Sequence, residues 1–394
     1  METQYKNLLH LLGAYLREDT PALSPDADWK KLAELAKIHS VVGILGYMSM
    51  KHPICPDPEI ASNLRNLCKS TVVCFTRRIV QAQMLVQELE NAGIDHILMK
   101  GYVLRDFYPV PELRSFNDID LVIRPDSRAK IDGLMLSLGY QRHDDWEPVF
   151  SYQQGDLLFE VHTDIMEIDV SDKADYRSYF QNMWDNVRPV SAHSYRFTPE
   201  FHFLYLLTHI AKHVHGSGAG IRMYLDIAAF IRHYGNTLNW DWINAQLTHL
   251  KLDIFAAVVL TAMEHWFGVP CPTVHAEISP EVMTQFLHFT MEAGVFGHHN
   301  RDEALSSLKH TSQEEPASRI RQVIHEVFPG AKTIENRYTY LQEKPWLLPA
   351  AWVHRLVKNR DRLGLRTKKI HSMLHADTDE IQKLHQLMQD IGLS

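Results

Sequence analysis

The stretch HILMKGYVLRDFYPVPELRSFNDIDLVI, residues 96–123, carries the pattern on which the fold depends. It begins with a short apolar run that stops at Lys100 and Gly101, and it ends in an apolar run that contains Asp118 and Asp120. Side chains alternate between the two faces of a strand, so we expect the two aspartates on one face and the apolar residues on the other. Neighbouring carboxylates at the edge of a buried strand repel each other. The pattern therefore predicts a strand whose polar face holds a cation or a shared proton.

Periodicity divides the chain into three parts. Residues 1–92 and 196–394 show apolar residues at helical spacing, whereas residues 93–195 contain runs with a period of two. The sequence therefore predicts an α+β protein, in which a small mixed-sheet α/β core at 93–195 is flanked by N-terminal and C-terminal helical regions. Within the core we expect strands at 97–99, 116–123, 148–153 and 156–164, and a helix at 126–138. Elsewhere we expect helices at residues 58–91, 201–216, 221–234, 240–250, 255–267, 280–291, 316–327, 346–360 and 379–391.

Composition limits the classes of protein to which the chain can belong. Its 394 residues suffice for two or three hydrophobic cores, and its net charge of −8 argues against coating of nucleic acid. The four cysteines form no CxxC pair, as is typical of a reduced compartment. Residues 1–19 lack the apolar run of a signal peptide, and no stretch approaches the roughly 20 apolar residues of a membrane span. We therefore expect a cytoplasmic protein with no membrane partner.

Residues around the two aspartates predict a site for phosphate and metal. Gly101 lets a ligand approach the backbone closely, Lys100 adds a positive charge, and a helix starting after the glycine would favour an anion. Glu160 lies on a later predicted strand, with His162 on the same face, and is a candidate third ligand for Mg²⁺, which prefers oxygen. Glu160 can also accept a proton from an acceptor hydroxyl, while His162 would orient that carboxylate or contact phosphate. The arrangement suits metal-assisted phosphoryl or nucleotidyl transfer.

Three motifs follow one another: MKG at 99–101, R-x-x-x-D-I-D-L-V-I at 114–123, and E-V-H at 160–162. This order resembles the nucleotidyltransferase superfamily related to DNA polymerase β, and within it the branch of uncharacterised nucleotidyltransferases. The resemblance implies that Asp118, Asp120 and Glu160 are catalytic residues and metal ligands, with Mg²⁺ or Mn²⁺ as cofactor and an NTP as co-substrate. It also implies that Gly101 contacts phosphate. Lys100-Gly101-Tyr102 stands where the superfamily has a Gly-Ser turn, as is typical of that branch.

The predicted helix at 201–216 carries further candidates for nucleotide binding. His209, Lys212 and His213 lie on one helical face. The resemblance includes this H-x-x-x-H pattern, followed by an acidic residue in the next helix, which is Asp226 here. The complete set of candidate nucleotide-binding residues is Lys100, Gly101, Arg114, His162, His209, Lys212 and His213.

Several charged residues also have a plainer interpretation. Lys100 and Arg114 can each form an ordinary salt bridge, and Arg222 and Asp226 can form an intrahelical ion pair one turn apart. His39, on the apolar side of an early helix, is expected to be a buried and hydrogen-bonded histidine. The basic run at 355–369 is either a solvated helix face or a site for an acidic acceptor.

We predict a metal-dependent nucleotidyltransferase that moves an NMP from an NTP, such as ATP, to an acceptor and releases pyrophosphate. The sequence leaves open which NTP is used, and whether the acceptor is a small molecule, a protein or RNA. One alternative is a non-catalytic nucleotide-binding or regulatory protein, antitoxin-like, on the same scaffold. Another is a glycosyltransferase that uses DID as its metal motif, but that class predicts a nucleotide-binding α/β domain at the N-terminus, where this chain is helical.

Overall fold

A computed structural model describes residues 1–146, 148–166, 170–171, 173–273, 277–294, 323–324, 327–334, 338, 340–358, 367 and 378–394. Most of the helix predicted at 316–327 and most of the basic run at 355–369 lie outside these residues. Among the described helices, none combines the length and the apolar character that crossing a membrane requires.

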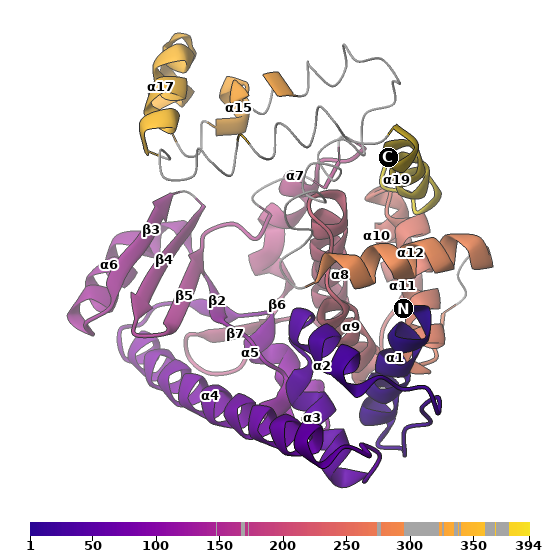
Figure 1. The fold of residues 1–394 in the computed structure, drawn as a ribbon. Helices are drawn as coiled ribbons and strands as arrows, with labels where there is room; N and C mark the ends of the chain where they lie inside the picture. Colours follow the sequence, from indigo (N-terminus) through magenta and orange to yellow (C-terminus); the bar gives the residue numbers. More distant parts are fainter. Residues whose placement is uncertain are drawn as a thin grey trace.

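Within the described residues, seven strands form one mixed sheet (Figure 1). They are β1 His96–Leu98, β2 Asp118–Ile123, β3 Gln141–Trp146, β4 Val149–Gln154, β5 Leu157–His162, β6 Val187–Pro189 and β7 Ser194–Phe197. Their order is β3-β4-β5-β2-β1-β7-β6, with β2 parallel to β5 and β1 parallel to β7. The other neighbours are antiparallel. The predicted α+β class with a mixed sheet is confirmed.

Three of the seven strands, β3, β6 and β7, have no counterpart in the predicted pattern. β3 reads QRHDDW and lies at one edge of the sheet, where it pairs with β4 alone. An edge strand carries charged residues, so its sequence lacks the apolar alternation by which strands are recognised. β6 and β7, at the other end of the sheet, are only three and four residues long. Such short runs leave too few positions for a period to show.

The N-terminal helices are α1 Glu2–Arg17, α2 Trp29–Ile38, α3 Val42–Lys51 and α4 Pro58–Asn91. α4 passes beneath the sheet in Figure 1 and has the bounds that the sequence predicts. Its start is specified locally, because the side chain of Asp57 accepts hydrogen bonds from the amides of Glu59 and Ile60, and Pro58 occupies the first turn. Beyond its end, Gly93 adopts a φ of 61°, a conformation that favours glycine.

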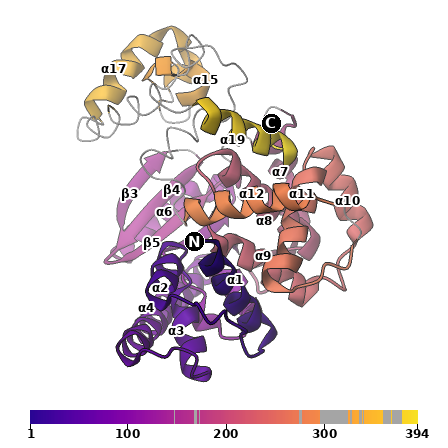
Figure 2. The same ribbon diagram turned by 45° about the vertical axis from the view of Figure 1, so that its right-hand side comes forward.

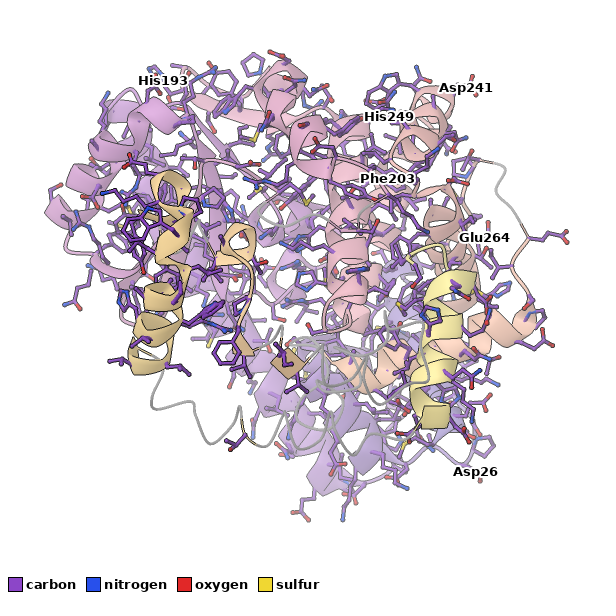
Figure 3. All side chains as sticks on the ribbon, turned by 90° about the horizontal axis from the view of Figure 1, so that it is seen from above. Asp26, His193, Phe203, Asp241, His249 and Glu264 are labelled. Carbon is purple, nitrogen blue, oxygen red and sulfur yellow. The ribbon has the colours of Figure 1, made fainter. Side chains whose placement is uncertain are left out.

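In the middle and C-terminal parts the predicted helices are present where the chain is described, and short helices at 176–181, 331–334 and 340–343 were not predicted. They are α5 Gly101–Leu104, α6 Arg128–Ser137, α7 Tyr176–Gln181, α8 Pro199–His215, α9 Ile221–Tyr234, α10 Trp240–His249, α11 Asp253–Ala262, α12 Pro280–Ala293, α15 Ala331–Ile334, α16 Tyr340–Glu343, α17 Leu348–Lys358 and α19 Thr378–Asp390. In Figure 2, α19 lies against α12. Seen from above, the sheet side with His193 lies on one side of the molecule, and α10 with Asp241 and His249 lies on the other (Figure 3).

α6 packs on one face of the sheet and α8 lies over the other, and the site lies on the face toward α8. On one face Arg128 of α6 lies 3.8 Å from the ring centre of Phe150, and the hydroxyl of Tyr152 donates to Asp132 at 2.9 Å. The apolar residues of β2 are buried, as the alternation predicts. The opposite face, with the aspartates of β2, looks toward α8 and α9 across a cavity.

His39 joins three helices from a fully buried position just after α2. Its Nδ1 accepts a hydrogen bond from the amide of Ile221 at 3.2 Å, and its Nε2 donates to the carbonyl of Met291 at 3.2 Å. An amide can only donate and a carbonyl can only accept, so these partners fit the neutral ring. Burial lowers the pKa of His39 to about 4. The expectation of a buried, hydrogen-bonded histidine is confirmed.

Candidate functional site

The polar face of β2 opens into a cavity of about 490 Å³ between the sheet, the turn after β1, and helices α8 and α9. All the predicted site residues except His162 line this cavity: Lys100, Gly101, Arg114, Asp118, Asp120, Glu160, His209, Lys212 and His213. The sheet contributes carboxylates, whereas the helices contribute imidazoles and a lysine. The volume lies within the range of about 300–1,000 Å³ that is usual for ligand pockets.

Strand pairing brings two of the carboxylates together. β2 and β5 are parallel, and Asp120 is the direct partner of Glu160 in their register. Ligand atoms of Asp120, Glu160 and His162 lie within 4.8 Å of one another. Asp118 lines the same cavity from a position opposite Leu158 and is outside this group. Joint metal binding by Asp118, Asp120 and Glu160 stays a prediction, and His162 becomes a candidate ligand.

Asp120 is buried and is held in its ionised form by two donors. Nζ of Lys100 lies 2.6 Å from its Oδ1, and Nε2 of His162 donates to the same oxygen at 3.2 Å. Burial would raise the pKa of Asp120, but Lys100 and the His162 hydrogen bond outweigh it and hold that pKa well below its usual range. Burial would likewise lower the pKa of Lys100, but Asp120 raises it well above its usual range. Lys100 therefore forms a salt bridge at the cavity wall.

The pKa of Asp118 is shifted in the opposite direction. Burial raises its pKa, the negative charge of Asp120 raises it further, and Lys100 and Arg222 oppose the shift. A bound cation would relieve the repulsion between the two carboxylates. Carboxylate oxygens with an adjacent imidazole also match the ligands that divalent cations take. The residues present therefore fit a divalent metal.

The turn between β1 and α5 is tight for two reasons. Lys100 adopts a φ of 48°, which is rare for a residue with a side chain, and its carbonyl accepts from the amides of Val103 and Leu104 at 3.1 and 2.9 Å. At Gly101 an added Cβ would overlap Nη1 of Arg114 and would lie 2.9 Å from Cβ of Phe116. Gly101 is thus required by packing, in addition to any approach of a ligand.

Arg114 is anchored to Asp226 rather than to the neighbouring strand. Its Nε and Nη2 donate to the two carboxylate oxygens at 3.0 and 2.6 Å, and both side chains are about 6% exposed. The hydroxyl of Tyr108 donates to Oδ1 of the same carboxylate at 2.7 Å. Asp226 therefore pairs with a residue 112 positions away, and the expected intrahelical pair with Arg222 is wrong. Arg114 still lines the cavity, so its nucleotide contact stays a prediction.

His209 and His213 form a pair on α8. Their Nε2 atoms lie 3.2 Å apart, so one ring donates and the other accepts. Burial, the partner ring and nearby lysines lower the pKa of His209 well below its usual range. Burial and then Lys212 lower the pKa of His213 to about 4. Both rings are therefore neutral near pH 7, and they offer hydrogen bonds to a ligand rather than charge.

Ser151 and Arg222 are among the residues that line the cavity without having been predicted as site residues. Ser151 of β4 is the direct partner of Glu160 in the antiparallel pairing of β4 and β5. The sequence could have predicted this pairing, because counting back from the hairpin turn at Gly155 places residue 151 opposite residue 160. Arg222 of α9 also lines the cavity. No local pattern in the sequence predicts that Arg222 lacks a salt-bridge partner, because that outcome depends on which distant cation pairs with Asp226.

One comparison with known protein families gives a match. A family model described as an uncharacterised nucleotidyltransferase matches residues 25–268. The solved structure of the antibiotic-resistance factor ANT(2″)-Ia is similar with 12% identity and a TM-score of 0.33, over 44% of this chain and 92% of that chain. A similarity this small carries no argument about function. No curated protein matches the chain.

Proposed function

This chain belongs to the family of uncharacterised nucleotidyltransferases, and from that premise we propose that it transfers an NMP from an NTP to an acceptor and releases pyrophosphate. The observation that carries the proposal is the pairing of Asp120 with Glu160 on adjacent parallel strands, at the wall of a cavity that Lys212 and Arg222 also line. Carboxylates on one wall suit a metal, and cations on the other suit phosphates.

Asp118, Asp120 and Glu160, with His162 beside them, would hold Mg²⁺ or Mn²⁺. When bound, the metal would supply charge stabilisation for the phosphates and would orient the reacting oxygens. Lys100 keeps Asp120 ionised and adds positive charge beside the turn that is predicted to face the triphosphate. Lys212 lines the same cavity and would steady the phosphates.

Glu160 is our proposed proton acceptor. Asp120 already accepts from Lys100 and His162, whereas the Glu160 side chain is 31% exposed and lies farther from His162, at 3.8 Å. In the proposed step an acceptor hydroxyl loses its proton to Glu160, and its oxygen forms a bond to the α-phosphorus. The bond from that phosphorus to the oxygen that links it to the β-phosphate breaks, and pyrophosphate leaves with that oxygen and the electron pair.

The test is transfer of label from each of four α-³²P NTPs, with MgCl₂ and a cell extract as the source of acceptor. We expect the full chain to label one acceptor class and to release pyrophosphate. Asp120→Asn and Glu160→Gln should each abolish labelling while circular dichroism stays unchanged. The matched control is Asp126→Asn, because Asp126 is an exposed carboxylate just after β2 and outside the cavity.

Labelling by Asp120→Asn at the wild-type rate would contradict the proposed site. Binding of Mg·NTP by the wild-type chain without labelling in any extract would contradict transfer and favour a non-catalytic nucleotide-binding protein.

A further inference from the structure

Arg222 is a charged residue at the cavity wall that forms no salt bridge within the described residues, although the charges of Asp226 and Asp118 act on it from a distance. Its Nη1 donates to the carbonyl of Ser115 at 2.7 Å, and its Nε is buried without a hydrogen-bond partner. Across the described part of the chain, no carboxylate lies within 4.0 Å of its guanidinium as an ion-pair partner. Arg222 is half-buried as a whole, and a buried donor such as its Nε is costly to leave without an acceptor.

The nearest acidic residue on its own helix is already fully engaged. Asp226 accepts two hydrogen bonds from Arg114 and one from Tyr108, so the charge of Arg114 balances the charge of Asp226. Burial lowers the pKa of Arg222 to about 10, and the positive charge of Arg114 contributes to that shift. Arg222 remains cationic at neutral pH.

The position of Arg222 indicates which part of a nucleotide it would contact. Arg114 and Arg222 both donate to the carbonyl of Ser115, at 3.2 and 2.7 Å, and Arg114 packs directly against Gly101. Arg222 therefore lies beside the turn at Lys100 and Gly101, where the sequence predicts phosphate. That turn continues with Tyr102, which is buried and does not line the cavity, so the turn offers the cavity no hydroxyl.

We propose that Arg222 binds the triphosphate of the nucleotide and supplies the donor that the turn at 100–102 lacks. This inference rests on the proposed function, because it assumes that an NTP enters the cavity. A guanidinium offers several donors in a planar fork, which matches phosphate oxygens better than an ammonium does. The bond to Ser115 holds one arm of the fork in place before the ligand arrives.

The experiment is calorimetric titration of the full chain with inorganic tripolyphosphate and MgCl₂, and separately with Mg·ATP. Loss of a hydrogen bond to a charged group costs about 1.5–3 kcal/mol, so Arg222→Gln should weaken tripolyphosphate binding roughly 10-fold to 150-fold. Arg222→Lys keeps the charge without the fork and should recover part of the loss. The control is Arg232→Gln on the same helix, because Arg232 is exposed and pairs with Glu18 at 3.3 Å. It should bind like the wild type.

Thermal unfolding separates binding from a structural role. Since Arg222 forms no salt bridge in the free protein, Arg222→Gln should unfold no more than a few degrees below the wild type. Wild-type affinity for tripolyphosphate in Arg222→Gln would overturn this inference while leaving the proposed function intact. A large fall in the unfolding temperature of both Arg222→Gln and Arg222→Lys would also overturn the inference, because it would show that Arg222 stabilises the fold. A wild-type chain that binds neither tripolyphosphate nor any NTP would overturn the proposed function as well.

Discussion

Neutralising Asp226 removes the charge at the centre of a buried cluster that joins the loop before β2 to helix α9. In Asp226→Asn the amide keeps one acceptor oxygen, but the bidentate pair with Arg114 is lost and a guanidinium about 6% exposed is left without an anion. Breaking one side of a buried ion pair costs about 3–5 kcal/mol. The hydroxyl of Tyr108 can still donate to the remaining oxygen, so we expect a fall of about 3 kcal/mol in the free energy of unfolding.

Urea denaturation followed by tryptophan fluorescence would measure this loss. The matched control is Glu18→Gln, which breaks the pair between Glu18 and Arg232 of the same helix, where the side chains are 59% and 38% exposed. Exposed pairs contribute about 0–1 kcal/mol, so the control should unfold almost like the wild type. Asp226→Leu combined with Arg114→Met should recover part of the stability, because both charges are then absent. A loss in Asp226→Asn as small as that of the control would refute the reasoning.

Further substitutions test the turn and the buried histidine. Gly101→Ala should lower the free energy of unfolding by about 1–3 kcal/mol, because its methyl group would overlap a neighbouring guanidinium; Gly133→Ala, where nothing lies within 4 Å of the new methyl, should instead stabilise α6 by roughly 0.5–1 kcal/mol. Equal effects in urea denaturation would contradict this contrast. His39 has a pKa of about 4 when folded and about 6.5 when unfolded, so the unfolded chain takes up its proton first and stability should fall as pH drops from about 6.5 to 4. His39→Gln retains a donor and an acceptor without titrating, so its unfolding free energy should fall less steeply over that range, and parallel curves for the two proteins would show that His39 does not contribute.

Much of the fold follows from local pattern. Apolar spacing places α4 with its exact bounds as predicted, and the period of two places β2, β4 and β5 within a residue or two. The two edge strands are not predicted by this kind of reasoning, because β3 is charged and β6 is only three residues long. Which strands pair in parallel is likewise a long-range outcome, since β1 and β7 are about a hundred residues apart in the chain.

The positions of the two aspartates on β2 can be predicted from the order of residues alone. Alternation along a strand puts Asp118 and Asp120 on the face opposite their apolar neighbours, and this is a local property of the backbone. The motif order also leads to Glu160, which the structure places directly opposite Asp120.

The cations of the site depend on long-range packing instead. Helical spacing predicts an ion pair between Asp226 and Arg222. In the folded chain, however, Arg114 and Tyr108 bind the same carboxylate from more than a hundred residues away in the sequence. A buried carboxylate takes the partners that satisfy it most completely, and a bidentate fork with a hydroxyl does so better than one residue a turn away. Arg222 is left over at the cavity wall, and no local pattern in the chain reveals that outcome.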